Sequence, residues 1–227
     1  MIVELKDIFK SYSEGEDNPR RNILDSFNLL INFDESISIV GPSGCGKTTL
    51  LNILGTLDKP DSGEVIFKGE LVTHMNDDQL SKLRAEKIGF IFQSHYLLPQ
   101  ISVIENVILP TLAVNRKQNN SIIFDEAENL LSQVGLKKQA HKFPSQLSGG
   151  EKQRVAIVRS LINKPNLVLA DEPTGSLDKS RGEDIIDLLK TLCVNNQTSL
   201  VVVTHDVEIA SQMKRRLCYK NYDFIES

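Results

Sequence analysis

Residues 36–57 read SISIVGPSGCGKTTLLNILGTL, and this stretch decides the fold. An apolar run over residues 37–40 leads into a glycine-rich loop at 41–48, and apolar residues then recur at helical spacing over 50–57. The loop has the spacing G-x-x-x-x-G-K-T between a predicted strand and a predicted helix, which is the context that a phosphate-binding P-loop requires. We therefore predict a P-loop here, rather than a glycine-rich turn with a chance lysine.

The residue types of this loop suit phosphate. Glycines without a Cβ let the backbone adopt positive φ angles and point its N–H groups at phosphate oxygens, and the following helix N-terminus adds partial positive charge. We expect Lys47 to reach the β- and γ-phosphates and the Thr48 hydroxyl to ligate Mg²⁺. The expected nucleotide-binding residues of the loop are Gly41, Pro42, Ser43, Gly44, Cys45, Gly46, Lys47, Thr48 and Thr49.

Composition indicates a soluble globular protein. The 227 residues are 40% apolar, enough for a core in one large domain or two small ones. The formal charge is −4 and there is no basic block, so a nucleic-acid partner is not expected. No apolar run approaches the roughly 20 residues that span a bilayer, and the N-terminus lacks the plan of a signal peptide. We expect a cytoplasmic chain unless a partner holds it at a membrane.

Cysteine and histidine usage gives no metal site. Three cysteines without metal spacing, which cannot all pair with one another, suit a reducing compartment. Cys45 lies in the phosphate loop and is either a reactive thiol or a small tolerated residue, with the second interpretation favoured. Three histidines show no metal spacing and are predicted to lie at the surface. They are His74, His95 and His141.

Hydrophobic patterning predicts an α/β core. Residues 2–9 and 64–68 are bounded by turn residues and indicate a small antiparallel sheet. Four short, nearly continuous apolar runs suggest parallel strands buried on both faces. These runs are 37–40, 88–92, 167–170 and 200–203. Helical spacing occurs at 127–134 and 185–192, and residues 94–161 hold helices without a convincing strand, which predicts a helical insertion into the core.

Two carboxylates, Asp171 and Glu172, end the predicted strand 167–170. At the carboxyl end of a parallel strand beside a P-loop, Asp171 is placed to hold Mg²⁺ and its waters. Glu172 is then free to take a proton from the water that attacks the γ-phosphate, which would make it the general base. The alternative is a pair of solvated acids at a strand end.

Ser148, Gly149 and Gly150 precede a helical pattern over residues 152–162. A serine with two glycines at a helix start can bind an anion by the same physics as the P-loop. Such a cap is common, however, and by itself it indicates a structural role more often than a functional one.

Four motifs together carry a family resemblance. The P-loop, LSGGEKQR at 147–154, LADEPTGSLD at 169–178 and Thr204-His205-Asp206 occur in this order, and they resemble an ATP-binding cassette (ABC) ATPase over essentially the whole chain. Given this resemblance, we expect the Ser-Gly-Gly motif to have a functional rather than a purely structural role. It implies an α/β fold of the P-loop NTPase (RecA-like) type, with a parallel-sheet core, an N-terminal antiparallel β-subdomain and a helical subdomain inserted at about 94–161. The residues 1–227 would form a single ABC ATPase domain.

The resemblance also implies cofactors and site residues. ATP and Mg²⁺ would be bound, and two ATPs would be sandwiched in a head-to-tail homodimer between the P-loop of one chain and the LSGGE motif of the other. The implied catalytic residues are Lys47, Gln93, Glu172 and His205. The implied metal-site residues are Thr48, Gln93 and Asp171. The implied nucleotide contacts outside the P-loop are Tyr12, Ser148, Gly149, Gly150, Glu151 and Asp178.

Individual roles follow from the matched motifs. Gln93 would sense Mg²⁺ and the attacking water, His205 would contact the γ-phosphate, and residues 176–178 would communicate across the dimer. Tyr12 matches the aromatic that stacks on adenine, although it could also be an ordinary exposed tyrosine. In this sequence Asp34-Glu35-Ser36 stands where most members of the family have a glycine turn before the P-loop strand, and aspartate tolerates a left-handed backbone. Residues 220–223 replace a usual Asp-Gly turn, which leaves the C-terminal detail open.

The implied activity is ATP hydrolysis coupled to transport. The chain would bind integral membrane permease subunits and act peripherally at the cytoplasmic face of the inner membrane. The apolar segment 89–110 would either receive the coupling helices of the membrane subunit or be buried against the helical insertion. Residues 54–58, 93–99 and 170–175 are similar to lipoprotein-releasing, macrolide-exporter and cell-division cassette ATPases, and the run His-Tyr-Leu-Leu-Pro within 93–99 favours the lipoprotein-releasing type.

Three other functions remain as alternatives. A P-loop kinase would have no use for LSGGE paired with a switch histidine. Hydrolysis of ATP in the absence of a phosphate acceptor would distinguish an ABC ATPase from such a kinase. A nucleic-acid-linked cassette ATPase usually carries long coiled coils or extra domains, and the acidic balance opposes it. An ATP-gated structural linker would keep the motifs without moving a substrate.

Overall fold

The central sheet organises the chain. The structure, a computed structural model, describes residues 1–13, 20–114, 120–220 and 223–226. The sheet has the strand order β10-β9-β3-β8-β7-β6, and β9, β3, β8, β7 and β6 run parallel to their neighbours, which confirms the predicted parallel core. These strands are β3 (Ser36–Val40), β6 (Ile88–Phe92), β7 (Leu167–Asp171), β8 (Ser199–Thr204), β9 (Arg215–Lys220) and the antiparallel edge strand β10 (Asp223–Glu226).

A second sheet is antiparallel, with the order β2-β1-β4-β5. Its strands are β1 (Val3–Tyr12), β2 (Arg21–Ile31), β4 (Ser62–Phe67) and β5 (Glu70–Leu71). β1 and β4 match the predicted segments. The sequence pattern does not predict β2, because register shifts in its pairing with β1 interrupt the alternation of buried and exposed side chains.

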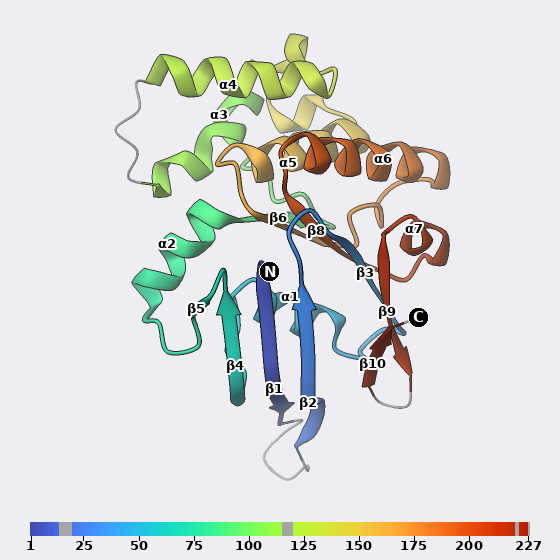
Figure 1. Cartoon of the computed structure of the whole chain (residues 1–227). Coiled ribbons are helices and arrows are strands. Elements are labelled where there is room, and N and C mark those ends of the chain that lie inside the picture. Colours follow the sequence, from blue (N-terminus) through green and yellow to red (C-terminus); the bar gives the residue numbers. More distant parts are fainter. Residues whose placement is uncertain (14–19, 115–119, 221–222, 227) are drawn as a thin grey trace.

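Helices separate the parallel strands. They are α1 (Lys47–Leu54), α2 (Asp77–Lys87), α3 (Val103–Ile108), η1 (Leu109–Ala113), α4 (Asn120–Gln133), η2 (Lys137–Gln139), η3 (Pro144–Gln146), α5 (Gly149–Leu161), α6 (Lys179–Asn195) and α7 (Val207–Ser211). The described part of 94–161 contains helices and no strand, as predicted. Figure 1 shows α3 and α4 stacked above α5 and α6, on the side of the central sheet opposite to β1, β2 and β4.

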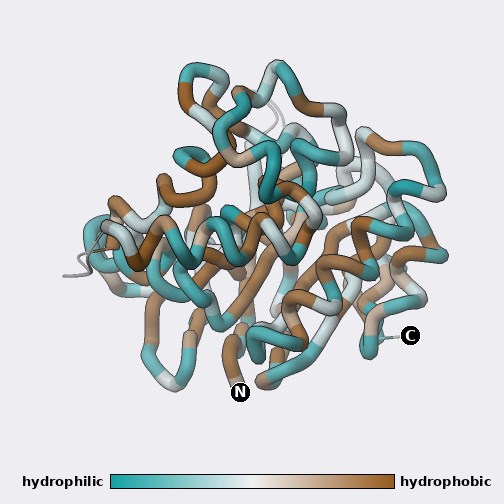
Figure 2. The backbone as a smooth tube through the Cα atoms, turned by 90° about the horizontal axis from the view of Figure 1, so that it is seen from above, coloured by the Kyte–Doolittle hydropathy of each residue, from teal (hydrophilic) through white to brown (hydrophobic). Residues whose placement is uncertain are grey.

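Two clusters of buried side chains hold these layers together. Val168 and Ala170 of β7 pack with α3, α4, α5 and α6, whereas Leu167 and Leu169 of the same strand pack with α1 and the antiparallel sheet. The central strands are therefore buried on both faces, which is why they appear in the sequence as nearly continuous apolar runs. The tube view shows the same order, with hydrophobic stretches inside and hydrophilic turns outside (Figure 2).

Local details agree with the chemistry of the residues. Asp34 has φ 56°, the left-handed conformation expected where a glycine is usual. The strands β9 and β10 pair as a hairpin, and residues 221–222 at its tip lie outside the described residues. The three cysteines all lie within the described residues and form no disulfide there. In the described ranges, no helix has the length and apolar character needed to cross a membrane.

Candidate nucleotide-binding and hydrolysis site

The P-loop joins the end of β3 to α1 and has the backbone that the glycines predict. Gly44 and Gly46 have φ angles of 77° and 103°, in the region that favours glycine. A Cβ on Gly46 would also lie 2.3 Å from Cγ2 of Ile23, so this position has no room for a side chain. Among the described residues, no side chain caps the start of α1, and its first N–H groups are available to an anion.

Lys47 lies within this loop. Its Nζ donates to the carbonyl oxygens of Gly41 (2.7 Å) and Pro42 (2.9 Å), and the side chain is largely buried. Arg21 of β2 adds a second cation, donating from Nη2 to the carbonyl of Gly44 at 3.1 Å. The antiparallel sheet thus reaches the P-loop through Ile23 and Arg21, which no sequence pattern predicts because β2 itself is not predicted.

Oxygen ligands suited to Mg²⁺ meet beside the loop. The Thr48 hydroxyl donates to Oδ2 of Asp171 at 3.1 Å, which links the start of α1 to the end of β7. Burial raises the pKa of Asp171, while the Thr48 hydrogen bond lowers it and the charge of Glu172 raises it further. No set of three or more metal-binding side chains occurs among the described residues. One carboxylate and one hydroxyl fit Mg²⁺, which binds through few protein ligands and completes its shell with phosphates and water.

Glu172 and His205 form a pair next to the Asp171 carboxylate. Nδ1 of His205 lies 2.9 Å from Oε1 of Glu172, and the Glu172 N–H donates to the carbonyl of Val203 in β8. In the part of the chain that the structure describes, the buried Oε2 of Glu172 has no hydrogen-bond partner. A cavity of about 240 Å³ adjoins both residues. A buried carboxylate oxygen without a partner is suited to bind a water or a proton.

Gln93 follows β6 at the same edge of the sheet. A Cβ on Gly175 would lie 2.7 Å from Nε2 of Gln93, so this side chain packs against the loop that follows β7. Within the described residues it makes no hydrogen bond to Thr48 or Asp171. The structure places Gln93 near the site without joining it to the metal-site residues.

Ser148 and Glu151 belong to a separate region. The Ser148 N–H and hydroxyl both donate to Oε2 of Glu151 at 2.8 Å, and the Ser148 hydroxyl oxygen accepts from the Glu151 N–H at 3.4 Å, forming a capping box at the start of α5. Gly149 neighbours Leu177, whose Cδ2 is 3.7 Å from a Cβ built on the glycine. Across the described ranges, no hydrogen bond joins residues 148–151 to the P-loop.

Asp178 caps another helix. Its Oδ1 accepts from the N–H of Arg181 at 3.0 Å, at the start of α6, and its Oδ2 lies 3.3 Å from the Arg181 guanidinium. In one chain, therefore, the structure gathers Lys47, Thr48, Asp171, Glu172 and His205 at the carboxyl ends of β3, β7 and β8, and it leaves Ser148 to Glu151 outside this group. Asp178 lines the same cavity as Glu172 and His205.

Comparisons with known proteins agree with this geometry. The family model described as "ABC transporter" matches residues 24–175. The chain belongs to the ABC transporter family. It is similar to the lipoprotein-releasing system ATP-binding protein LolD of Shewanella frigidimarina, with 43% identity over 97% of this chain and 90% of the relative. It is also similar to the macrolide export ATP-binding/permease protein MacB of Pasteurella multocida, with 41% identity over 99% of this chain and 34% of the relative.

Solved structures extend the comparison to the fold. A dimeric ATP-binding cassette in a post-hydrolysis state, bound to ADP and Pi, is 41% identical, with a TM-score of 0.89 over 100% of this chain and 98% of that one. The P-loop NTPase fold with a parallel-sheet core is therefore confirmed. As an ABC ATPase, the protein is an ATP-hydrolysing subunit whose activity is coupled to transport.

The structure supports the favoured interpretation of Cys45 and corrects one prediction about a histidine. The Cys45 side chain is buried, as a small packed residue is, and it is not an accessible thiol. His95 is half-buried rather than a surface residue, because Arg159 donates to the carbonyls of His95 and Tyr96, both at 2.6 Å, and holds this turn against α5. Burial lowers the pKa of His95, and the charges of Lys152 and Arg159 lower it further. His74 and His141 are exposed, as predicted.

The apolar segment 89–110 is buried in part against the helical layer, which is one of the two expected alternatives. Ile91, Val103 and Val107 are buried with the helical layer. Tyr96 nevertheless remains 64% exposed, and a groove of about 410 Å³ runs along the segment. The groove is lined by Leu57, Ser81, Arg84, Ala85, Ile88, Gly89, Phe90, Phe92, Pro110, Arg159, Ser160 and Asn163.

Proposed function

We propose that this ABC ATPase binds Mg²⁺ and ATP at its P-loop and hydrolyses ATP with Glu172 as the general base. The observation that carries the proposal is the convergence of a cation, a hydroxyl–carboxylate pair and a histidine–carboxylate pair at one edge of the central sheet. Ligands of open parallel sheets bind outside the carboxyl ends of the strands, where these groups lie.

Each group has a role that its contacts support. Lys47 would exchange its two loop carbonyls for phosphate oxygens, since an ammonium gains more from an anion than from a neutral acceptor. Thr48 and Asp171 would hold Mg²⁺, which supplies charge neutralisation on the phosphates. His205 contacts Oε1 of Glu172 through Nδ1, which leaves Oε2 for the attacking water. Glu172 would accept the proton of this water. Gln93 and Tyr12 would contact the water and the adenine, respectively.

We also propose that residues 1–227 form a single ABC ATPase domain, with 94–161 as its helical subdomain. Both buried clusters include side chains of β7 and β8, so the two layers share the same strands. Such sharing favours one cooperative unit. Coincident unfolding transitions by far-ultraviolet circular dichroism and tyrosine fluorescence would support a single domain, and two separated transitions would contradict it.

A complete site would need two copies of the chain. The start of α5, residues 148–151, lies apart from the P-loop and from the carboxylates beside it. A similar cassette forms a dimer bound to ADP and Pi. In a head-to-tail homodimer, the start of α5 and Asp178 from one protomer would reach the nucleotide on the P-loop of the other.

Mixing two inactive variants tests this composite site. In a heterodimer of Lys47→Ala with Ser148→Arg, one site combines the intact P-loop with the intact α5 start, and the other site carries both lesions. We expect each variant alone to lack ATPase activity and the mixture to regain part of it. An inactive mixture that still forms heterodimers, as measured with two different affinity tags, would contradict the composite site.

We propose lipoprotein release as the coupled process, with integral permease subunits as partners at the cytoplasmic face of the inner membrane. The apolar groove beside the exposed Tyr96 offers a docking surface for a membrane subunit. The match to the lipoprotein-releasing relative covers 90% of that protein, against 34% of the macrolide-exporting one, which favours the first. Macrolide-type efflux and an ATP-gated linker in cell division are the alternatives.

Affinity purification in mild detergent tests the partner. Tagged Glu172→Gln would be purified with and without ATP, and the membrane proteins that accompany it would be identified. Two multi-spanning subunits with large periplasmic domains would support lipoprotein release. A single fused partner would favour macrolide-type export, and a division-site partner would favour the linker role. The matched control is Lys47→Ala, which should lose any ATP-dependent recovery.

A further inference from the structure

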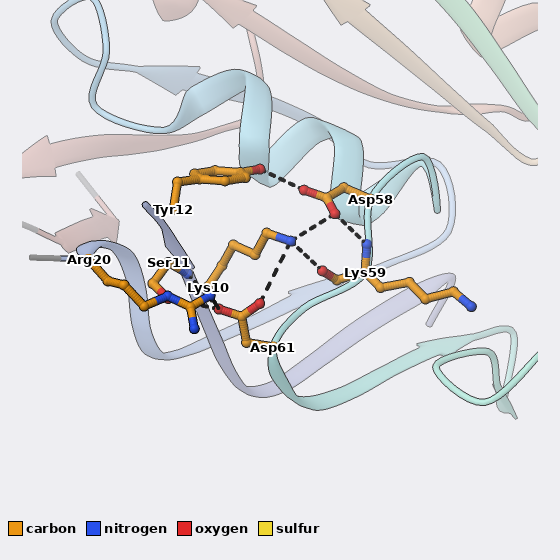
Figure 3. Close-up of polar contacts among 7 residues, drawn as sticks. All are labelled: Lys10, Ser11, Tyr12, Arg20, Asp58, Lys59 and Asp61. Atoms are coloured by element: carbon orange, nitrogen blue, oxygen red, sulfur yellow. Dashed lines mark hydrogen bonds and ion pairs between the residues drawn. The ribbon is translucent and has the colours of Figure 1, made fainter. Parts of the chain in front are cut away.

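A nearly buried lysine in β1 contacts the segment that follows α1 (Figure 3). The side chain of Lys10, in β1, is only 9% exposed. Its Nζ donates to Oδ1 of Asp58 at 2.8 Å and to the carbonyl of Lys59 at 2.7 Å, and it lies 3.9 Å from Oδ1 of Asp61. Because a buried charge is costly without partners, this lysine fixes the position of Asp58.

The second oxygen of Asp58 points at Tyr12. The tyrosine hydroxyl donates to Oδ2 of Asp58 at 2.6 Å, and the Lys10 ammonium lies 5.1 Å from the centre of the tyrosine ring. Burial raises the pKa of Tyr12, and the hydrogen bond to Asp58 raises it further, so the hydroxyl remains a donor. Burial also favours a higher pKa for Asp58, but the hydrogen bonds from Lys10 and Tyr12 outweigh this effect and lower it.

These contacts hold the tyrosine hydroxyl against α1 and the segment that follows it. Asp58 follows α1, the helix that begins at the P-loop, whereas Tyr12 is the last residue of β1. The Tyr12 hydroxyl also interacts with Thr49 in the first turn of α1. The ring is nevertheless 41% exposed. One end of the side chain is therefore fixed while part of the ring remains accessible to a ligand.

We propose that Asp58 is a positioning residue that fixes the ring of Tyr12 for contact with the base of the bound nucleotide. This inference rests on the proposed function, because it needs a nucleotide on the P-loop. An aromatic ring that is already ordered binds more tightly, since less side-chain freedom is lost on binding, and one such side chain changes affinity roughly twofold to tenfold. Lys10 acts one step earlier by holding Asp58.

A purely structural role of the cluster makes a different prediction. If the Lys10, Asp58 and Tyr12 contacts only tied β1 to the loop after α1, their loss would disturb the whole P-loop. Ligands with and without a base would then be affected alike. If Asp58 positions the ring, only a ligand with a base should be affected, because the phosphates are bound by other residues.

Calorimetric titration with Mg·ATP and with Mg·tripolyphosphate, which has no base, separates the two. We expect Asp58→Ala and Tyr12→Phe to weaken ATP binding about fivefold and to leave tripolyphosphate binding unchanged. Tyr12→Ala should weaken ATP binding about tenfold, because it also removes the stacking face. In steady-state assays, KM for ATP should rise while kcat stays the same.

Asp61→Ala is the matched control. Asp61 also lies near Lys10, and it accepts from the N–H and hydroxyl of Ser11, but among the described residues it makes no hydrogen bond with Tyr12. We expect this variant to bind both ligands as the wild type does. Equal weakening of ATP and tripolyphosphate by Asp58→Ala would overturn the inference, and so would unchanged ATP binding.

Two further variants keep the test decisive. If Asp58→Ala does not fold, Tyr12→Phe removes the same hydrogen bond from the other side. Lys47→Ala separates this inference from the proposed function. Loss of both ligands in Lys47→Ala, together with wild-type behaviour of Asp58→Ala and Tyr12→Phe, would overturn only the role of Asp58. Unchanged binding of both ligands by Lys47→Ala would instead refute the P-loop assignment.

Discussion

The starts of α1 and α5 are two glycine-flanked helix termini with different chemistry. At α1 no side chain of the described ranges caps the terminus, and Lys47 and Thr48 lie beside open N–H groups. At α5 the Ser148 side chain and Glu151 satisfy one another in a capping box. The first terminus is prepared for an anion within one chain, whereas the second is already satisfied and needs another molecule to give it a function.

The start of α3 has the same capping box as the start of α5, so this local geometry does not by itself indicate a function. At α3, Ser102 and Glu105 form the same capping box, with a hydroxyl-to-carboxylate distance of 2.6 Å against 2.8 Å at α5. Ser102 is buried, while Ser148 is exposed. Exposure, rather than the capping box, separates a terminus that a second chain can reach from one that it cannot.

The largest expected effect comes from changing Glu172, the proposed general base of the site beside the start of α1. Glu172→Gln should lower ATP hydrolysis by about 10²- to 10⁴-fold, because the amide cannot accept the proton of the attacking water. ATP binding should be retained and the dimer should accumulate, as measured by phosphate release and size-exclusion chromatography with ATP. Glu208→Gln, in the same cavity, is the control. Substantial hydrolysis by Glu172→Gln would contradict the assigned base.

Lys47→Ala tests whether the open terminus binds phosphate. The variant removes a charged donor from the loop, and we expect ATP affinity to fall roughly 10- to 100-fold, the equivalent of about 1.5 to 3 kcal/mol. Calorimetry with Mg·ATP measures the change. Lys164→Ala, whose ammonium pairs with Glu126 at the surface, should bind ATP normally. Equal affinity of Lys47→Ala and the wild type would remove the basis for the P-loop.

Ser148→Ala and Ser102→Ala separate a cap from a functional contact. Each variant should lose about 1 kcal/mol of unfolding free energy, because a capping hydroxyl is removed. Only Ser148→Ala should also lower ATPase activity, since only this serine would meet the nucleotide of the partner protomer. Urea denaturation and phosphate release give the two readings. An equal loss of activity in both variants would attribute the effect to stability alone.

The smallest expected effect is a pH dependence at α5. Hydrogen bonds from the backbone N–H and hydroxyl of Ser148 lower the pKa of Glu151 below its ordinary 4.5, and Arg154 and Lys142 add attraction. A lowered pKa stabilises the fold fully above 4.5 and loses this effect as the pH falls through the lowered value. Because solvent screens this carboxylate, we expect Glu151→Gln to cost only about 0.3 kcal/mol at pH 7.

The same comparison in acid checks the cause. Urea denaturation at pH 7, 5 and 3 should show the difference between the wild type and Glu151→Gln shrinking below pH 4.5. Glu105→Gln at α3 should follow the same direction, because hydrogen bonds from Ser102 lower the pKa of Glu105. A difference in unfolding free energy that stayed constant with pH would mean that the shape of the side chain, rather than its charge, causes the effect.

Periodicity predicts the elements with strong patterns. Four of the five parallel strands, namely β3, β6, β7 and β8, and helices α4 and α6 follow from it, because strands buried on both faces and amphipathic helices leave clear signals. It does not predict α2, where Leu80 is the only fully buried residue and the apolar stripe is therefore weak. It also gives no sign of the Arg159 contacts that bury part of His95, since these join residues more than 60 positions apart.

The sequence by itself determined the P-loop, the order of the four motifs and the parallel core, because these depend on local spacing and on residue chemistry. Only the tertiary structure decided which groups meet: Thr48 with Asp171, Glu172 with His205, and Lys10 with Asp58 and Tyr12. It also decided that the start of α5 lies outside this group. The physical reason is that such contacts join separate elements, and their geometry is set by how the two sheets and the helical layer pack around α1 and β7.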